Sequence, residues 1–248
     1  MRNIILASLA TLALAACNEE ERLDIQPSTA NTFMDMVWPI VQEDQEGTAV
    51  ELDTDIFREN YLVVLDLSGS MNESSCSGSF DTKKDAAIDA LENWIQMVDA
   101  DAAVGLVTFY QGVTNIIVEV APNNHRNFAD SLAGLSADGG TPLSSAVAVG
   151  YRALESRAFL QNGVGSYKMV VVTDGTHSPG FNPVDNIDWI IANTPIEMYT
   201  IGFCIGGNSA LNQPGKTIYA EADSPEKLFS GLTNALAETQ DFNLTSFE

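Results

Sequence analysis

The sequence predicts an α/β fold, a doubly wound, mainly parallel six-stranded sheet flanked by helices. Strand-like apolar runs alternate with helical patterns along the chain, which is the order typical of a parallel sheet. Several of the runs are almost continuously hydrophobic, as expected for strands that are covered on both faces. Six runs are expected to form strands, at residues 61–67, 103–109, 116–120, 168–173, 197–204 and 217–220.

Helical patterns fill the intervals between these runs. An apolar stripe at helical spacing extends from Ala86 to Val98. Asn182-Pro183 and Ser224-Pro225 each place a capping side chain before a proline, which is a common start of a helix. Another helix is predicted to begin at Thr141-Pro142, with an inward face formed by Leu143, Ala146, Val147, Gly150 and Leu154.

The first residues resemble a bacterial lipoprotein signal. Arg2 precedes an apolar stretch, residues 4–14, that is too short for a membrane-spanning helix of about 20 residues. The stretch ends in Leu14-Ala15-Ala16-Cys17, which is similar to a lipobox and implies cleavage before Cys17 and lipidation of that residue. In lipoproteins an aspartate after the cysteine favours the inner membrane. Asn18 stands there, so the outer membrane is favoured. An ordinary signal peptide with a free Cys17 is the alternative.

Five segments are expected along the chain. The polar, acidic composition of residues 18–30 does not bury enough apolar surface to order itself. The residues that follow are apolar enough to pack, although Pro39 interrupts any helix there. The predicted segments are a signal peptide (1–16), lipidated Cys17 with an acidic tether (17–30), an N-terminal extension that packs on the domain (31–60), the α/β domain (61–240) and a C-terminal tail (241–248).

The composition argues against nucleic-acid binding. Of the 248 residues, 34 are acidic and 11 are lysine or arginine, which gives a formal net charge of −23. Binding to nucleic acid requires basic patches that neutralise phosphate. The longest basic run is Lys83-Lys84, at a predicted helix start. The same acidity repels anionic lipid headgroups, so the membrane is expected to be reached through the lipid anchor.

The remaining cysteines suit an exported protein. With Cys17 lipidated, Cys76 and Cys204 are an even pair in an oxidising compartment. Cys76 follows the first predicted strand and Cys204 ends a later one, so both are expected at the carboxyl edge of the sheet. A disulfide and two free buried thiols both remain open, because the sequence does not give the Cα separation. Zinc is not expected, since the cysteines and the two histidines lack ligand spacing.

Oxygen-bearing side chains lie at the ends of predicted strands or at a predicted helix start in three motifs: YLVVLDLSGSM at 61–71, GGTPL at 139–143 and VVTDG at 171–175. Hard oxygen ligands suit a small hard cation such as Mg²⁺. In this order the motifs resemble the metal-ion-dependent adhesion site of von Willebrand factor A domains, over a segment from Tyr61 to about Gln240. No motif position is missing. The departure from the family pattern is the Ser-rich segment 72–80, which contains Cys76.

The resemblance implies both a metal site and a binding function. It implies that Mg²⁺ or Mn²⁺ is held by Asp66, Ser68, Ser70, Thr141 and Asp174. An acidic residue of a protein partner would complete the coordination shell. Two of these five side chains are anionic and roughly neutralise the ion, while the hydroxyls add no charge. Taken singly, each residue also fits a turn or a helix cap, and their joint occurrence favours the metal site.

These features favour a lipid-anchored, metal-dependent protein-binding module of the bacterial cell envelope, acting in adhesion or assembly and not as an enzyme. A metal-independent scaffold with an idle site is one alternative. A magnesium-dependent phosphoryl hydrolase is another, because Asp66 ends a strand beside the metal site. Its difficulties are a serine at position 68, where a second acid is needed, and no evident phosphate-binding lysine. His177 is expected as a solvated loop residue on the rim, and His125 in a loop.

Overall fold

The computed structural model describes residues 38–39, 52–207 and 209–237 of the chain. The predicted signal peptide, Cys17, the acidic tether and the C-terminal tail lie outside the described residues. Within the described ranges, no helix is long and apolar enough to span a membrane.

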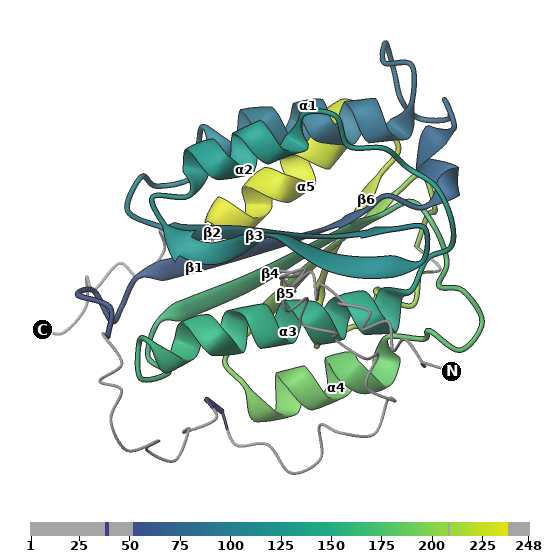
Figure 1. The fold of residues 1–248 in the computed structure, drawn as a ribbon. Helices are drawn as coiled ribbons and strands as arrows, with labels where there is room; N and C mark the ends of the chain where they lie inside the picture. Colours follow the sequence, from purple (N-terminus) through teal and green to yellow (C-terminus); the bar gives the residue numbers. More distant parts are fainter. Residues whose placement is uncertain (1–37, 40–51, 208, 238–248) are drawn as a thin grey trace, which may run out of the picture.

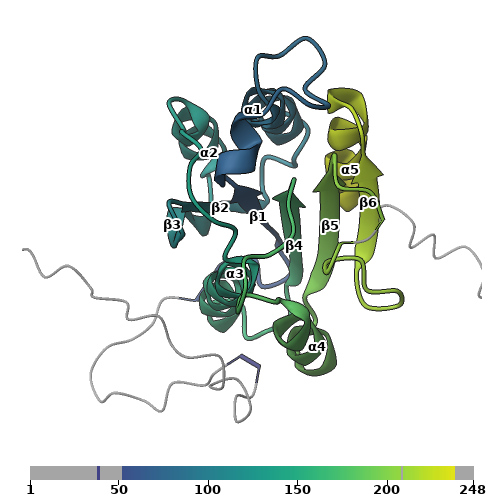
Figure 2. The same cartoon turned by 90° about the vertical axis from the view of Figure 1, so that its right-hand side faces the viewer.

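The sheet has six strands in the order β3-β2-β1-β4-β5-β6 (Figure 2). Of the strands in the described part of the chain, only β3 runs antiparallel to its neighbour, and the other pairings are parallel. The predicted mainly parallel, six-stranded fold is therefore confirmed, with every strand end within three residues of its prediction. The strands are β1 (Glu59–Asp66), β2 (Ala103–Tyr110), β3 (Val113–Pro122), β4 (Ser166–Thr173), β5 (Glu197–Phe203) and β6 (Ile218–Ala222).

Helices cover both faces of the sheet (Figure 1). One face carries α1 (Lys83–Ile95), α2 (His125–Leu132) and α5 (Pro225–Ala237), whose apolar residues share a core with Tyr61, Val63 and Leu65 of β1. The other face carries α3 (Leu143–Phe159) and α4 (Val184–Asn193), which pack against Leu62 and Val64. Successive residues of β1 point to opposite faces, so burial on both sides explains why the strand is apolar throughout.

Three of the predicted helix starts are found in the structure, and one helix was missed. α3, α4 and α5 begin directly after Pro142, after Pro183 and at Pro225. The prediction that His125 lies in a loop is wrong, because His125 is the first residue of α2. This helix has eight residues and buries only Phe128 and Leu132, too few apolar positions for a helical period to stand out.

Trp38 lies against the face that carries α3. Its ring centroid is 5.9 Å from that of Tyr151 and 5.3 Å from that of Tyr167. A Cβ on Gly163 would stand 2.8 Å from Cδ of Pro39, so the two residues are close neighbours. The wider prediction that residues 31–60 form an extension packed on the domain stays a prediction.

The topology brings the ends of β1 and β4 together. These two strands are parallel neighbours at the centre of the sheet, and β2 lies on the other side of β1. The chain leaves β1 toward β2 and later returns to form β4, so the strand order reverses beside β1. In open α/β sheets, such a reversal leaves a crevice at the carboxyl ends of the strands, where ligands bind.

Candidate metal site

The loop after β1 is buried and held by its own backbone. Asp66 and Ser68 are almost fully buried. The Ser68 N–H donates to Oδ1 of Asp66 at 2.7 Å, which folds the chain back over the carboxylate. A short 3-10 helix follows, η1 (Gly69–Asn72), and places the Ser70 hydroxyl 3.1 Å from that of Ser68. The first motif therefore gathers one carboxylate and two hydroxyls within a single turn.

The loop before α3 is joined to the loop after β1 by backbone hydrogen bonds. The Gly69 N–H donates to the Gly139 carbonyl at 3.0 Å, and the Asp138 N–H donates to the Leu67 carbonyl at 2.8 Å. Gly139 has a φ of 85°, and a Cβ there would lie 2.5 Å from Cα of Gln111. Only glycine fits this position, because any side chain would meet both a strained conformation and neighbouring backbone.

The loop after β4 is joined to the loop before α3. The Thr141 N–H donates to Oγ of Ser178 at 2.9 Å, and the Ser178 N–H donates to the Thr141 carbonyl at 2.9 Å. A Cβ on Gly175 would stand 3.6 Å from Oγ1 of Thr141 and 3.7 Å from Oγ of Ser70. The hydroxyls of Thr141 and Ser70 therefore border the same small space beside Gly175.

Asp174 closes the cluster. Its Oδ1 accepts a hydrogen bond from the Ser70 hydroxyl at 2.7 Å, across a sequence separation of 104 residues. The structure thus brings together the five side chains that the sequence selected, four through a chain of hydrogen bonds and Thr141 through its position beside Gly175. Whether they bind a metal ion stays a prediction.

Burial disfavours the ionised form of Asp66. It raises the pKa of Asp66 to about 6, although hydrogen bonds from Ser68 and Thr173 act in the opposite direction. The Thr173 hydroxyl donates to Oδ2 of Asp66 at 2.5 Å. The negative charge of Asp174 also raises this pKa. A divalent cation at this position would supply the positive charge that a buried carboxylate needs.

A buried lysine, which the sequence analysis did not select, also belongs to the site. Nζ of Lys83, the first residue of α1, donates to Oδ2 of Asp174 at 2.7 Å and to Oε2 of Glu73 at 3.0 Å. Burial by itself lowers the pKa of Lys83, but the hydrogen bonds and charges of these carboxylates outweigh it and leave that pKa raised. The conclusion that two carboxylates alone set the charge of the site is therefore incomplete.

One sequence signal could have identified this lysine. A cation in the first turn of a helix is disfavoured by the helix dipole, so Lys83 at the start of α1 calls for a specific anionic partner.

The donor set suits a small hard cation. It consists of carboxylate and hydroxyl oxygens, which Mg²⁺ and Mn²⁺ accept. Among the described residues, no three His, Cys, Asp or Glu side chains gather in a group that could hold a metal. This agrees with a set in which hydroxyls outnumber carboxylates. Because the set offers oxygen donors alone, a softer transition metal is a poor match.

A disulfide ties the rim of the site to the sheet. Cys76, in the loop between η1 and α1, is bonded to Cys204 directly after β5, with a Cα–Cα distance of 5.9 Å. The Cys204 N–H donates to the Ala222 carbonyl of β6 at 2.7 Å. The Ser-rich segment that departs from the family pattern is thereby attached to the carboxyl edge of the sheet.

The two histidines occupy different places. Nδ1 of His177 lies 3.1 Å from the Ser178 carbonyl, in the loop that contacts Thr141. Nε2 of His125 lies 2.9 Å from the Asp99 carbonyl, before the start of β2 and hence at the opposite edge of the sheet. His125 therefore does not belong to the candidate site.

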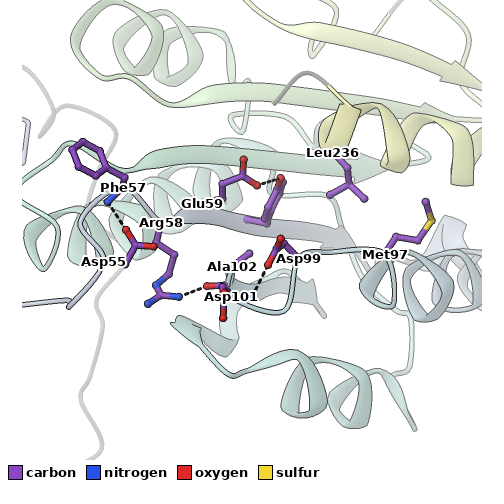
Figure 3. A pocket seen from close by; sticks show the side chains of 10 residues that line it. Asp55, Phe57, Arg58, Glu59, Met97, Asp99, Asp101, Ala102 and Leu236 are labelled. Atoms are coloured by element: carbon purple, nitrogen blue, oxygen red, sulfur yellow. Dashed lines mark hydrogen bonds between the residues drawn. The ribbon is translucent and has the colours of Figure 1, made fainter. Parts of the chain in front are cut away.

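A separate pocket of about 450 Å³ lies at that opposite edge, beside the starts of β1 and β2 (Figure 3). Its walls include Asp55, Asp99 and the exposed ring of Phe57. Both carboxylates are engaged with nearby backbone. Asp55 accepts a hydrogen bond from the Phe57 N–H, and Asp99 accepts one from the Asp101 N–H. None of the predicted metal ligands lines this pocket.

Residues 61–177 match the sequence model of the von Willebrand factor type A domain. The domain therefore belongs to the von Willebrand factor type A family. No curated protein matches the chain.

Solved structures show the same fold at low sequence identity. One is BatB from Bacteroides thetaiotaomicron, with 15% identity, a TM-score of 0.57, and coverage of 72% of this chain and 97% of that one. Another is an aerotolerance-related membrane protein from Bacteroides fragilis, with 14% identity, a TM-score of 0.55, and coverage of 72% and 98%. A third is manganese-loaded TRAP protein from Plasmodium vivax, with 14% identity, a TM-score of 0.55, and coverage of 73% and 74%. At such identities the likeness shows the fold alone.

Proposed function

We propose that this chain is a divalent-metal-dependent protein-binding module of the bacterial cell envelope, anchored through lipid on Cys17. The observation that carries the proposal is the gathering of five oxygen-bearing side chains from three loops at the carboxyl edge of the sheet. Mg²⁺ or Mn²⁺ would be held by Asp66, Ser68, Ser70, Thr141 and Asp174.

The bound ion would supply an electrophilic centre that an acidic residue of a protein partner completes. The surrounding residues prepare the site for this role. The Ser68 N–H and the Thr173 hydroxyl orient the carboxylate of Asp66, and the Ser70 hydroxyl fixes one oxygen of Asp174. Because these groups are positioned before any ligand arrives, binding costs little reorganisation.

Three fold relatives support the proposal. A fold relative was solved loaded with manganese, and another is described as an aerotolerance-related membrane protein. A further relative is the pilus adhesin SpaC from Lactobacillus rhamnosus, with 14% identity, and this chain covers 31% of it. The lipobox at Leu14-Ala15-Ala16-Cys17 adds the route to the membrane, with Asn18 favouring the outer membrane.

The structure adds one residue in favour of the alternative hypothesis of a phosphoryl hydrolase. That hypothesis lacked a lysine that could bind phosphate, and Lys83 lies beside the candidate metal site. However, its side chain is only 5% exposed, and both Asp174 and Glu73 accept hydrogen bonds from it. An ammonium group that is engaged in this way is poorly placed to bind a phosphate, so the binding module remains the better fit.

The test is capture of partners from envelope extract on the soluble chain from Asn18 to Glu248, in Mg²⁺ and in EDTA, with identification by mass spectrometry. We expect proteins that are retained only with metal and are lost with Asp174→Ala. Glu92→Ala, at an exposed position of α1, is the matched control and should retain them.

Three results would count against the proposal. Equal retention with and without metal would favour the idle-site scaffold. Chelator-sensitive capture by Asp174→Ala would contradict the assignment of the site. Metal-dependent hydrolysis of a phosphate monoester by the wild type would favour the enzyme.

A further inference from the structure

We infer that Lys83 sets the charge of the metal site: it neutralises Asp174, so that a bound divalent cation keeps a net positive charge for the partner's carboxylate. The inference rests on the proposed function, and it assigns a role to a residue outside the five-residue donor set.

The ion pair between Lys83 and Asp174 is almost fully shielded from water. The side chain of Lys83 is 5% exposed and that of Asp174 is 0% exposed, with Nζ and Oδ2 2.7 Å apart. Glu73, the second partner of the ammonium group, is 64% exposed. Solvent screens a charge pair at the surface far more than a buried one. The charge of Lys83 therefore acts mainly on Asp174.

Both oxygens of Asp174 are already engaged, one by the Ser70 hydroxyl and the other by Lys83. The orientation of the carboxylate is thus fixed, and its Oδ2 is occupied by the hydrogen bond from Lys83. Glu73 is left out of the sum because solvent screens its charge. With Asp66 and Asp174 each contributing one negative charge and Lys83 one positive charge, the buried groups carry a net charge of −1. A divalent cation added to them leaves +1, whereas two carboxylates alone would leave the site neutral.

This charge has two opposite consequences. It weakens the binding of the metal ion itself, because the cation enters beside a buried ammonium group. It strengthens the attraction of the loaded site for an anionic group, because an electropositive centre in a partly buried setting is poorly screened. Such a site binds the metal ion less tightly, but once loaded it binds the partner's carboxylate more tightly.

The stability of α1 alone does not explain the lysine. A cation at a helix N-terminus is disfavoured by the helix dipole. The Thr82 side chain already caps this helix, accepting a hydrogen bond from the Asp85 N–H. In contrast, the placement of the ammonium group against Asp174 has a direct electrostatic effect on the metal site.

The test is the affinity of the chain from Asn18 to Glu248 for Mn²⁺ and Mg²⁺ alone, measured by calorimetry. We expect Lys83→Met to bind either ion about tenfold more tightly or better, since an unpaired neighbouring anion favours a cation by about one to three powers of ten. Lys83→Arg keeps the charge and should stay within a few-fold of the wild type. Glu73→Gln should stay within a few-fold of the wild type, because Glu73 is 64% exposed and solvent screens its charge.

A second measurement uses acetate as the carboxylate probe. At equal ionic strength, sodium acetate should strengthen the metal affinity of the wild type relative to sodium chloride, and it should do so less in Lys83→Met. A lysine that served only to hold the fold would leave this acetate effect unchanged.

The results separate this inference from the proposed function. Unaltered or weaker metal binding by Lys83→Met overturns the role of Lys83, as does an Arg variant that behaves like Met. If Lys83→Met does not fold, Lys83→Gln decides, since it keeps a hydrogen-bond donor beside Asp174 and removes the charge, and a metal affinity equal to that of the wild type overturns the inference. A wild-type chain that binds no metal would instead overturn the proposed function itself.

Discussion

Replacing Asp66 with asparagine should stabilise the metal-free protein at neutral pH while abolishing metal binding. The reason is the burial of the carboxylate, which raises its pKa from 3.8 to about 6. Asparagine has nearly the same shape and carries no charge. Its oxygen still accepts the Ser68 N–H, and its amide donates to the Thr173 hydroxyl, which turns toward the Gly175 carbonyl at 3.4 Å.

The magnitude follows from the shift in pKa. Between about pH 4 and pH 6, folded Asp66 holds a proton that the unfolded chain releases, so the free energy of unfolding falls as the pH rises. A shift of about two pKa units corresponds to about 3 kcal/mol, all of which is lost above pH 6. Asp66→Asn has no ionisable group at this position, so its free energy of unfolding does not fall in this way. Its advantage over the wild type should therefore be absent near pH 4 and reach about 3 kcal/mol by pH 7.

The assay is urea unfolding of both proteins after removal of metal by chelation, at several values of pH from 4 to 7.5. Asp81→Asn, at an exposed position before α1, is the control for loss of one surface charge. Adding Mg²⁺ should raise the stability of the wild type and leave that of Asp66→Asn unchanged. A variant that is less stable than the wild type at pH 7.5, or a difference that does not vary with pH, would refute the reasoning.

Two further predictions concern the frame of the site. Gly139→Ala should cost more than about 2 kcal/mol of unfolding free energy, because its Cβ would lie 2.5 Å from Cα of Gln111 at a positive φ. Gly134→Ala has a φ of 78° and no atom within 4 Å of its Cβ, so chemical denaturation should show a smaller loss, and equal losses would contradict the clash. Replacing Cys76 and Cys204 together with serine opens a loop closed across 128 residues and should lower stability by up to about 5 kcal/mol. Denaturation under non-reducing conditions measures this change, and an unaltered midpoint would argue against the disulfide.

The sequence predicted the sheet well because strands that are buried on both faces are almost continuously hydrophobic, a pattern that is easy to recognise. β1 is apolar from Tyr61 to Leu65 and ends at the polar Asp66, so the apolar run located the strand and its carboxyl end. The prolines at 142, 183 and 225 similarly located three helix starts. In contrast, α2 is too short for its two buried positions to form a recognisable period, so His125 was placed in a loop.

The candidate ligands were predictable for a related reason. Each lies within a short motif at the end of a strand or the start of a helix, and parallel strands bring such ends to one edge. Local sequence therefore determined which residues could meet and what chemistry they offer.

Only the tertiary structure decided the electrostatics of the site. Lys83 reaches Asp174 across 91 residues, and Thr173 reaches Asp66 across 107. The place of Lys83 in the first turn of a helix indicates that it needs an anionic partner but does not say which one. The contact between Thr173 and Asp66 leaves no local trace in the sequence. The sequence by itself determined the fold and selected the five oxygen-bearing side chains, because these depend on local composition and spacing. The metal site and the export signal stay predictions. The burial of Asp66 and its raised pKa, and the ion pair of Lys83, depend on packing between distant segments, and only the folded chain fixes that packing.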